Sequence, residues 1–212
     1  NEITWQKFFF FFSKSKALID TAFIRLDEKE RETLNQNLYY LISEYANLRT
    51  IDVQLDPLQS LHALNSSMHI NFSALLNSAA TFKCIVNQSF NLSFPVAIRV
   101  KMIPNEIKEA ITGEIKHIQQ HGSLWLVYGG EGNNSYDMSV IDIVFDPAGA
   151  DTYSYQDTTP FQTKLIIDKR GNDQYRSADI GPAAAWLGTS IVIDYEGNDL
   201  YEGNDLYEGR LA

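Results

Sequence analysis

The chain contains 212 residues, of which 44% are hydrophobic and 21% are charged, a composition typical of a globular protein and not of a disordered chain. No apolar run is long enough to cross a bilayer as a helix, and the single cysteine excludes an internal disulfide and a multi-cysteine zinc site. The net charge of −10 argues against nucleic acid as the main partner.

This negative charge lies entirely in the C-terminal part of the chain. Residues 1–126 contain 12 acidic and 12 basic side chains, whereas residues 127–212 contain 15 acidic and 5 basic ones. Such an asymmetry is typical either of a solvated acidic surface that maintains solubility or of a surface that binds cations.

The first residues favour helices. The five consecutive phenylalanines at 8–12 are too few to span a membrane, and we expect them to pack in the core as part of a first helix. Residues 27–30 resemble a capping box, in which the side chains of the first and fourth residues bind each other's backbone N–H groups. This motif predicts a helix that continues to about Ala46, with apolar residues at helical spacing.

The segments that follow give mixed signals. Residues 57–80 are weakly helical and are interrupted by Asn and Ser. Residues 96–102 alternate between apolar and other side chains, which predicts a short strand. Pro104 is expected to open another helix that ends before Gly122.

That last predicted helix carries three possible metal ligands. Glu114, His117 and His121 would lie on one flank of a helix, where they could hold a metal ion. The general-base Glu of zinc-protease helices is missing after His117, so we interpret the two histidines as surface residues. Cys84 lies in an apolar stretch and is expected to be a buried small residue, not a nucleophile.

A short pattern recurs four times in the C-terminal part. Its consensus is two apolar residues followed by Asp-x-x-Gly-x-Asp-x-Tyr, and in the first copy Tyr128 and Asn134 are read in place of the two aspartates. Self-similarity at about 20 residues is typical of solenoids, in which stacked units bury an apolar face that one unit cannot bury alone. Spacings of 17, 22 and 26 residues separate the key glycines Gly132, Gly149, Gly171 and Gly197.

Each copy can be interpreted physically. The β-branched apolar run before the first Asp fits a strand packed on a core, and the Gly is expected to supply the positive φ of a tight turn. We therefore predict an α+β protein with a mainly α-helical domain at residues 1–123, which includes the short strand near 96–102. An Asp- and Gly-rich right-handed parallel β-helix or β-roll solenoid is predicted for residues 124–212.

Stacked copies would bring the aspartates into two columns. Neighbouring strands lie about 4.8 Å apart, and two carboxylates at that distance repel by roughly 3–4 kcal/mol at an effective dielectric constant of about 20. Calcium, which takes about six to eight oxygen ligands, would relieve this repulsion; alternatively, each Asp caps its own turn and no metal is bound. The candidate metal ligands are Asp146, Asp151, Asp168, Asp173, Asp194 and Asp199.

The turn at residues 129–136 resembles the Gly-Gly-x-Gly-x-Asp repeat of calcium-binding RTX β-rolls. The longer copies, with Leu-Ile-Ile-Asp or Ile-Val-Ile-Asp before Gly-Asn-Asp-x-Tyr, resemble a repeat of secreted or cell-surface bacterial β-helix proteins. The resemblance covers roughly residues 124–209. It implies an exported bacterial repeat domain that is extracellular, attached to the cell surface or periplasmic, and it implies calcium as the bound ion.

Two functions are consistent with these patterns. The first is a non-catalytic structural or binding module that takes divalent cations and docks to a protein or cell-surface partner. The second is an extracellular hydrolase of polysaccharides or peptides, since paired carboxylates can perform acid–base chemistry. Its candidate acids, Asp142, Asp157 and Asp179, lie outside the two predicted columns.

The end of the sequence repeats six residues in tandem over 195–209. Six residues are too few for a further unit, so the extra copy containing Gly203, Asp205 and Tyr207 is expected to be a local extension. Because the chain starts at Asn1 without Met and stops without a predicted cap, we expect it to be a piece of a longer protein.

Overall fold

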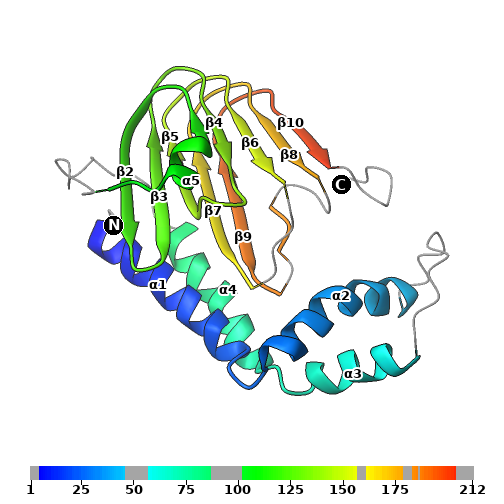
Figure 1. Cartoon of the computed structure of the whole chain (residues 1–212). Coiled ribbons are helices and arrows are strands. Elements are labelled where there is room, and N and C mark those ends of the chain that lie inside the picture. The colour runs from blue at the N-terminus through cyan, green and yellow to red at the C-terminus, as the bar shows by residue number, and fades with distance from the viewer. Residues whose placement is uncertain are drawn as a thin grey trace.

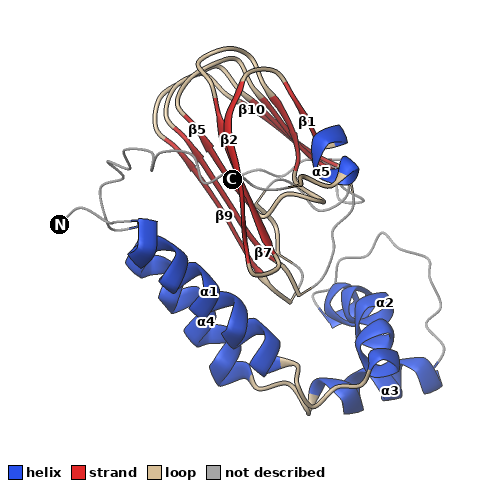
Figure 2. Ribbon diagram, turned by 60° about the vertical axis from the view of Figure 1, so that its left-hand side comes forward, coloured by secondary structure: helices blue, strands red, loops and turns tan. Residues whose placement is uncertain are grey.

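The computed structural model describes residues 5–45, 57–86, 102–156, 161–178, 183–185 and 187–203. They form a mixed α/β fold with five short helices and two five-stranded sheets (Figure 1). A pair of helices covers one sheet, and the second sheet lies on the other side of the first (Figure 2). The helices are α1 (Trp5–Ala22), α2 (Glu28–Tyr45), α3 (Pro57–Ser67), α4 (Phe72–Val86) and α5 (Asn105–Glu109).

The strands after α5 alternate between the two sheets. Sheet A has the order β1 (Ile111–Thr112), β4 (Ser135–Asp137), β6 (Thr152–Tyr155), β8 (Gln174–Ser177) and β10 (Leu200–Gly203). Sheet B has the order β2 (Ile115–His121), β3 (Leu124–Gly129), β5 (Ile143–Asp146), β7 (Thr163–Asp168) and β9 (Thr189–Asp194).

The predicted fold class is wrong. Both sheets are mixed, because β1 runs antiparallel to β4 and β2 runs antiparallel to β3, while the later strands of each sheet run parallel. Within the described ranges, the strands do not close into a solenoid, so the right-handed parallel β-helix or β-roll is not formed. A tight hairpin is the physical reason at the edge of sheet B, where Gly122 has a φ of 62° and reverses the chain between β2 and β3.

The helix predicted from Pro104 to Gly122 is also wrong. Only the five residues of α5 are helical, and the following residues form β1 and β2. The pairing of β2 with β3 satisfies the backbone of residues 115–121 across the sheet. The strand predicted near 96–102 lies outside the described residues except at Met102.

Three of the five phenylalanines at 8–12 pack in the core as predicted, whereas Phe10 is 62% exposed. Phe8 and Phe12 are fully buried, and Phe9 is nearly so. With Phe82 of α4, they contact one face of sheet B, which contributes Leu126, Ile143, Phe145, Leu165 and Ile167. Burial of these rings fixes the helix pair α1 and α4 against the sheet.

The opposite face of sheet B packs against sheet A. Successive strand side chains point to opposite faces, so Val127, Val144 and Ile166 face the tyrosines of sheet A. The three tyrosines Tyr136, Tyr153 and Tyr175 are fully buried there, and α5 closes this core at one end with Ile107. Sheet B is therefore buried on both faces at its centre.

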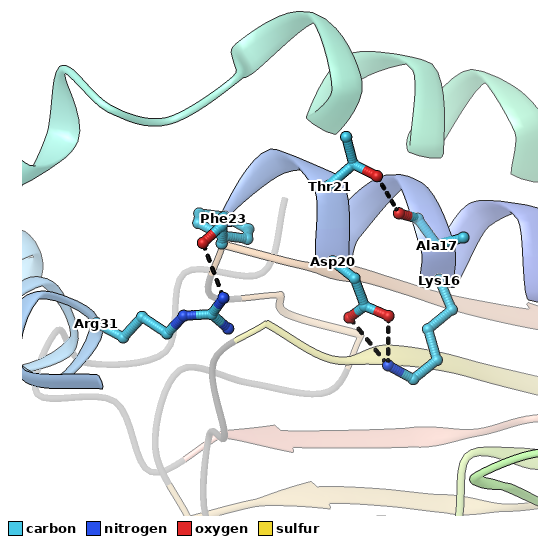
Figure 3. Close-up of polar contacts among 6 residues, drawn as sticks. All are labelled: Lys16, Ala17, Asp20, Thr21, Phe23 and Arg31. Atoms are coloured by element: carbon cyan, nitrogen blue, oxygen red, sulfur yellow. Dashed lines mark hydrogen bonds and ion pairs between the residues drawn. The ribbon is translucent and has the colours of Figure 1, made fainter. Parts of the chain in front are cut away.

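The predicted capping box is confirmed at the start of α2. Asp27 accepts a hydrogen bond from the Glu30 backbone N–H at 2.8 Å, and Glu30 accepts one from the Asp27 backbone N–H at 2.9 Å. Figure 3 shows how Arg31 then fixes the corner between α1 and α2, by donating to the Phe23 carbonyl at 2.8 Å. The exposed pair Lys16–Asp20 lies on α1 in the same view.

Among the residues that the structure describes, no helix is both long and apolar enough to cross a membrane.

Candidate metal centre

The register of the parallel strands brings the predicted aspartates together. In sheet B, Asp146 pairs with Asp168, and Asp168 pairs with Asp194. The second set of aspartates follows the turn, directly before the strands of sheet A. Each carboxylate in this set accepts a hydrogen bond from the backbone of the preceding repeat. We name the first column Asp146, Asp168 and Asp194, the second column Asp151, Asp173 and Asp199, and the two together the aspartate ladder.

Each first-column aspartate caps its own turn and accepts a tyrosine hydroxyl. Asp146 Oδ1 accepts the Ala148 backbone N–H at 3.1 Å, and Asp168 Oδ1 accepts the Arg170 backbone N–H at 3.0 Å. The other oxygens accept hydroxyl groups from sheet A: Tyr136 donates to Asp146, Tyr153 to Asp168 and Tyr175 to Asp194. The aspartates of this column therefore cap their own turns, as the interpretation without a metal predicts. Capping occupies only one oxygen of each carboxylate.

The second column connects successive repeats through the backbone. Asp151 Oδ1 accepts the Asn134 backbone N–H at 2.6 Å, Asp173 Oδ1 accepts the Asp151 backbone N–H at 2.7 Å, and Asp199 Oδ1 accepts the Asp173 backbone N–H at 2.9 Å. Asp151 and Asp173 are each 1% exposed. Their Oδ2 atoms are buried, and no backbone N–H, hydroxyl or amide of a described residue donates to them. The carboxyls of Asp151 and Asp146 form a hydrogen bond to each other when one of them is protonated.

The glycines allow this close stacking, but mostly not through the predicted positive φ. Of the four key glycines, only Gly149 has a positive φ, at 151°. At Gly171, a Cβ atom would lie 2.2 Å from the Gly149 carbonyl oxygen and 2.5 Å from Asp173 Oδ1. At Gly197, it would lie 2.0 Å from the Gly171 carbonyl oxygen. The missing side chain lets each turn contact the preceding one and leaves room for the second-column carboxylate.

The tyrosines form a continuous stack beside the ladder. Ring centroids are 5.3 Å apart between Tyr136 and Tyr153, 4.8 Å between Tyr153 and Tyr175, and 4.6 Å between Tyr175 and Tyr201. In the last two pairs the ring planes are nearly parallel, with interplanar angles of 8°. This stack holds the hydroxyl groups at the same position in every repeat.

Burial without cationic donors makes these carboxyls weak acids. The groups that donate to them are backbone N–H groups, tyrosine hydroxyls and the Asn134 amide, all of which are uncharged. Desolvation by burial raises the pKa of Asp151 and of Asp168 to about 8 and that of Asp173 to about 6. The same cause raises the pKa of Asp146 and Asp194. Burial therefore disfavours the charged form of these carboxyls, and a bound positive charge would favour it.

Two groups of three carboxylates can converge on such a charge. The first consists of Asp146, Asp151 and Asp168, and the second of Asp168, Asp173 and Asp194. In each group the three ligand oxygens lie within 4.8 Å of one another. An ion with ligands at about 2.4 Å, the range of calcium, spans oxygens up to about 4.8 Å apart. The sixth predicted ligand, Asp199, is outside both groups.

The first repeat differs from its predicted alignment. Tyr128 pairs with Phe145, so Gly129, not Tyr128, lies opposite Asp146. A Cβ atom at Gly129 would lie 2.2 Å from Asp146 Oδ2 and from the Tyr136 hydroxyl. The absence of a side chain at this position lets the tyrosine reach the carboxylate of the next repeat.

The other candidate residues are placed elsewhere. Asp142 accepts the Trp125 backbone N–H at 2.8 Å and forms an ion pair with the buried Lys164 at 3.4 Å. Asp157 and Asp179 lie outside the described residues. His117 is buried in β2, whereas His121 stacks on Phe9 with centroids 4.7 Å apart, so the predicted helical flank does not exist. The side chain of Cys84 is also outside the described part.

Sequence reasoning missed two contributors to the ladder. The fixed position of the tyrosine, two residues after the second Asp, predicts that the two share a face of an extended segment. Its hydroxyl instead donates to the first-column aspartate of the next repeat. In the sequence, Asn134 only replaces an aspartate and weakens the case for a metal in the first repeat, yet its side chain donates to Asp146 Oδ2 at 3.0 Å. Comparison with protein-family models, curated proteins and solved structures gives no match for this chain.

Proposed function

We propose that this protein is a non-catalytic binding module whose aspartate ladder takes up divalent cations, with calcium as the preferred ion. The ladder stiffens the two sheets when the ion is bound. The module thereby presents a rigid surface to a protein or cell-surface partner.

One observation carries this proposal. When the carboxyls are ionised, each three-carboxylate group contains one buried oxygen to which no described residue donates a hydrogen bond: Asp151 Oδ2 in the first and Asp173 Oδ2 in the second. An unpartnered buried polar atom costs about 1–3 kcal/mol, and more when it is charged. A bound cation would remove this cost at both places.

The ligand chemistry favours calcium among the common ions. All three side chains of each group offer carboxylate oxygens and none offers sulfur or imidazole, which suits a hard cation. Magnesium requires shorter bonds of about 2.0–2.1 Å and near-octahedral geometry, whereas oxygens spread over up to 4.8 Å suit the longer bonds of calcium. Zinc prefers nitrogen and sulfur ligands.

The setting that we propose is outside the cytoplasm: extracellular, on the cell surface or in the periplasm. Calcium modules that work there need dissociation constants of only about 10⁻⁴–10⁻³ M. Three ionised carboxylates would more than neutralise the two charges of the ion, and backbone carbonyls and water would complete the coordination shell.

The test is thermal unfolding of the full chain at pH 7.5 in EDTA and in increasing calcium chloride, combined with calorimetric titration. At a calcium concentration of about 100 times the dissociation constant, binding stabilises the native state by about 2.7 kcal/mol per site. For a chain of this length, each kcal/mol raises the melting temperature by about 2–4 °C.

Magnesium chloride at the same concentration serves as the matched ion, and we expect a much smaller rise in melting temperature. A melting temperature unchanged in 5–10 mM calcium, on the order used for weak sites, would contradict the proposal. The aspartates would then share protons and cap turns without a metal.

A further inference from the structure

The ladder begins with an amide in place of a carboxylate. Asn134 takes the position in the first repeat that Asp151 and Asp173 take in the next two, since each backbone N–H donates to the aspartate one repeat later. Its Nδ2 group donates to Asp146 Oδ2 at 3.0 Å, and it is 4% exposed. The amide thus supplies a positive dipole where the later repeats have only carboxylates.

The two groups of carboxylates are not independent. Asp168 belongs to both, and its neighbours in sheet B, Asp146 and Asp194, belong to one each. A cation in either group therefore draws on the same Asp168 carboxylate. A third site one repeat earlier would have only one carboxylate, that of Asp146. Gly129 and Asn134 stand there at the positions that aspartates occupy in the later repeats.

We infer that the ladder binds two cations, that Asp168 ligates both of them and thereby links the two sites, and that the Asn134 amide takes the place of a third cation. This inference rests on the proposed function and sets its stoichiometry. Asp151 and Asp173 belong to one group each, and the Oδ2 atom of each lacks a donor when the carboxyls are ionised. The buried Oδ1 atom of Asn134 also lacks a donor, but it belongs to a neutral amide.

Calorimetric titration of calcium into the full, chelator-treated chain tests the count, with native mass spectrometry as a second measure of stoichiometry. The wild-type chain is expected to bind two ions. Asp151→Asn and Asp173→Asn are each expected to leave one, and the double variant none. Asp168→Asn is expected to weaken both binding steps by at least tenfold.

Asp20→Asn is the matched control, since it makes the same chemical change on an exposed ion pair of α1. It is expected to bind two ions with wild-type affinity. In EDTA, Asp151→Asn is expected to melt at a higher temperature than wild type, because its amide can donate within the ladder as Asn134 does. Asp20→Asn should not show this gain.

The outcomes separate the two proposals. A wild-type chain that binds no calcium contradicts cation binding itself. A wild-type chain that binds a single ion, an Asp168→Asn variant that loses only one of two, or an Asp151→Asn variant that loses both overturns the linked pair while cation binding stands.

Discussion

The hydroxyl group of Tyr153 donates a hydrogen bond to the carboxylate of Asp168, which lies 15 residues further along the chain and on the other sheet. Both side chains are fully buried. The same relationship joins Tyr136 to Asp146 and Tyr175 to Asp194, so each repeat of sheet A is tied to the next repeat of sheet B. These bonds connect the aromatic stack to the acidic ladder.

Replacing Tyr153 with Phe should therefore destabilise the protein by about 1–3 kcal/mol, because the ring still fills its place in the stack but a buried carboxylate oxygen loses its donor. Chemical denaturation measures this change. Tyr195→Phe is the control, since Tyr195 is 52% exposed, and it should cost less than about 0.5 kcal/mol. Equal losses in the two variants would show that the buried hydroxyl has no special role.

The raised pKa values predict an unusual pH dependence. An unfolded aspartate has a pKa of about 3.9, whereas burial raises the pKa of Asp151 and Asp168 to about 8. Between these values the folded state keeps protons that the unfolded state has lost, so the free energy of unfolding decreases as the pH rises from about 4 to about 8.

Calorimetric melting in EDTA at several pH values should show this decrease, amounting to several degrees between about pH 5 and pH 8. Saturating calcium favours the charged carboxylates, so the melting temperature should decrease less with rising pH when calcium is bound. If stability in EDTA stays level or increases over this range, the buried carboxyls do not hold their protons in the folded state.

Glycine in the turns should be required for space. In Gly171→Ala, the new Cβ atom would lie 2.2 Å from the Gly149 carbonyl oxygen, and the stacked turns must separate. We expect a loss of about 3 kcal/mol, together with weaker calcium binding. Gly122→Ala isolates the effect of φ, because Gly122 has a φ of 62° and open space around it, and it should cost only about 1–2 kcal/mol. Denaturant unfolding compares the two, and a smaller loss at Gly171 would contradict the packing explanation.

How far the sequence predicts this structure depends on the range of the interactions. The capping box of Asp27 and Glu30 is a local motif and was predicted correctly. The register of Asp146 with Asp168 was also predicted, because both follow equivalent apolar strands. The hairpin at Gly122 was missed because residues 105–121 alone fit a helix, and only pairing with β3 makes β2 a strand.

The composition of the ladder could be predicted only in part for a similar reason. The pattern identified the aspartates, but it did not reveal that tyrosines of sheet A reach them, since that contact depends on how the two sheets pack. The function of Asn134 likewise depends on a register in which Gly129 lies opposite Asp146. Such contacts are set by tertiary packing and not by local propensity.

The phenylalanine cluster offers a test of whether α1 belongs to the same folding unit as the sheets. Phe12 is fully buried, 5.3 Å from the ring of Phe82, and lies in the core that includes Leu126 of sheet B, whereas Phe10 is 62% exposed. Phe12→Ala should cost about 3–5 kcal/mol and lower the melting temperature by about 10 °C, while Phe10→Ala should cost less than about 0.5 kcal/mol. The stacked tyrosines give a near-ultraviolet circular dichroism signal for the sheets, and far-ultraviolet circular dichroism reports the helices. A single cooperative transition that shifts in Phe12→Ala by both signals would show that the helix pair supports the sheets. Two separate transitions, with only the helical signal shifted, would show instead that the repeats fold without it.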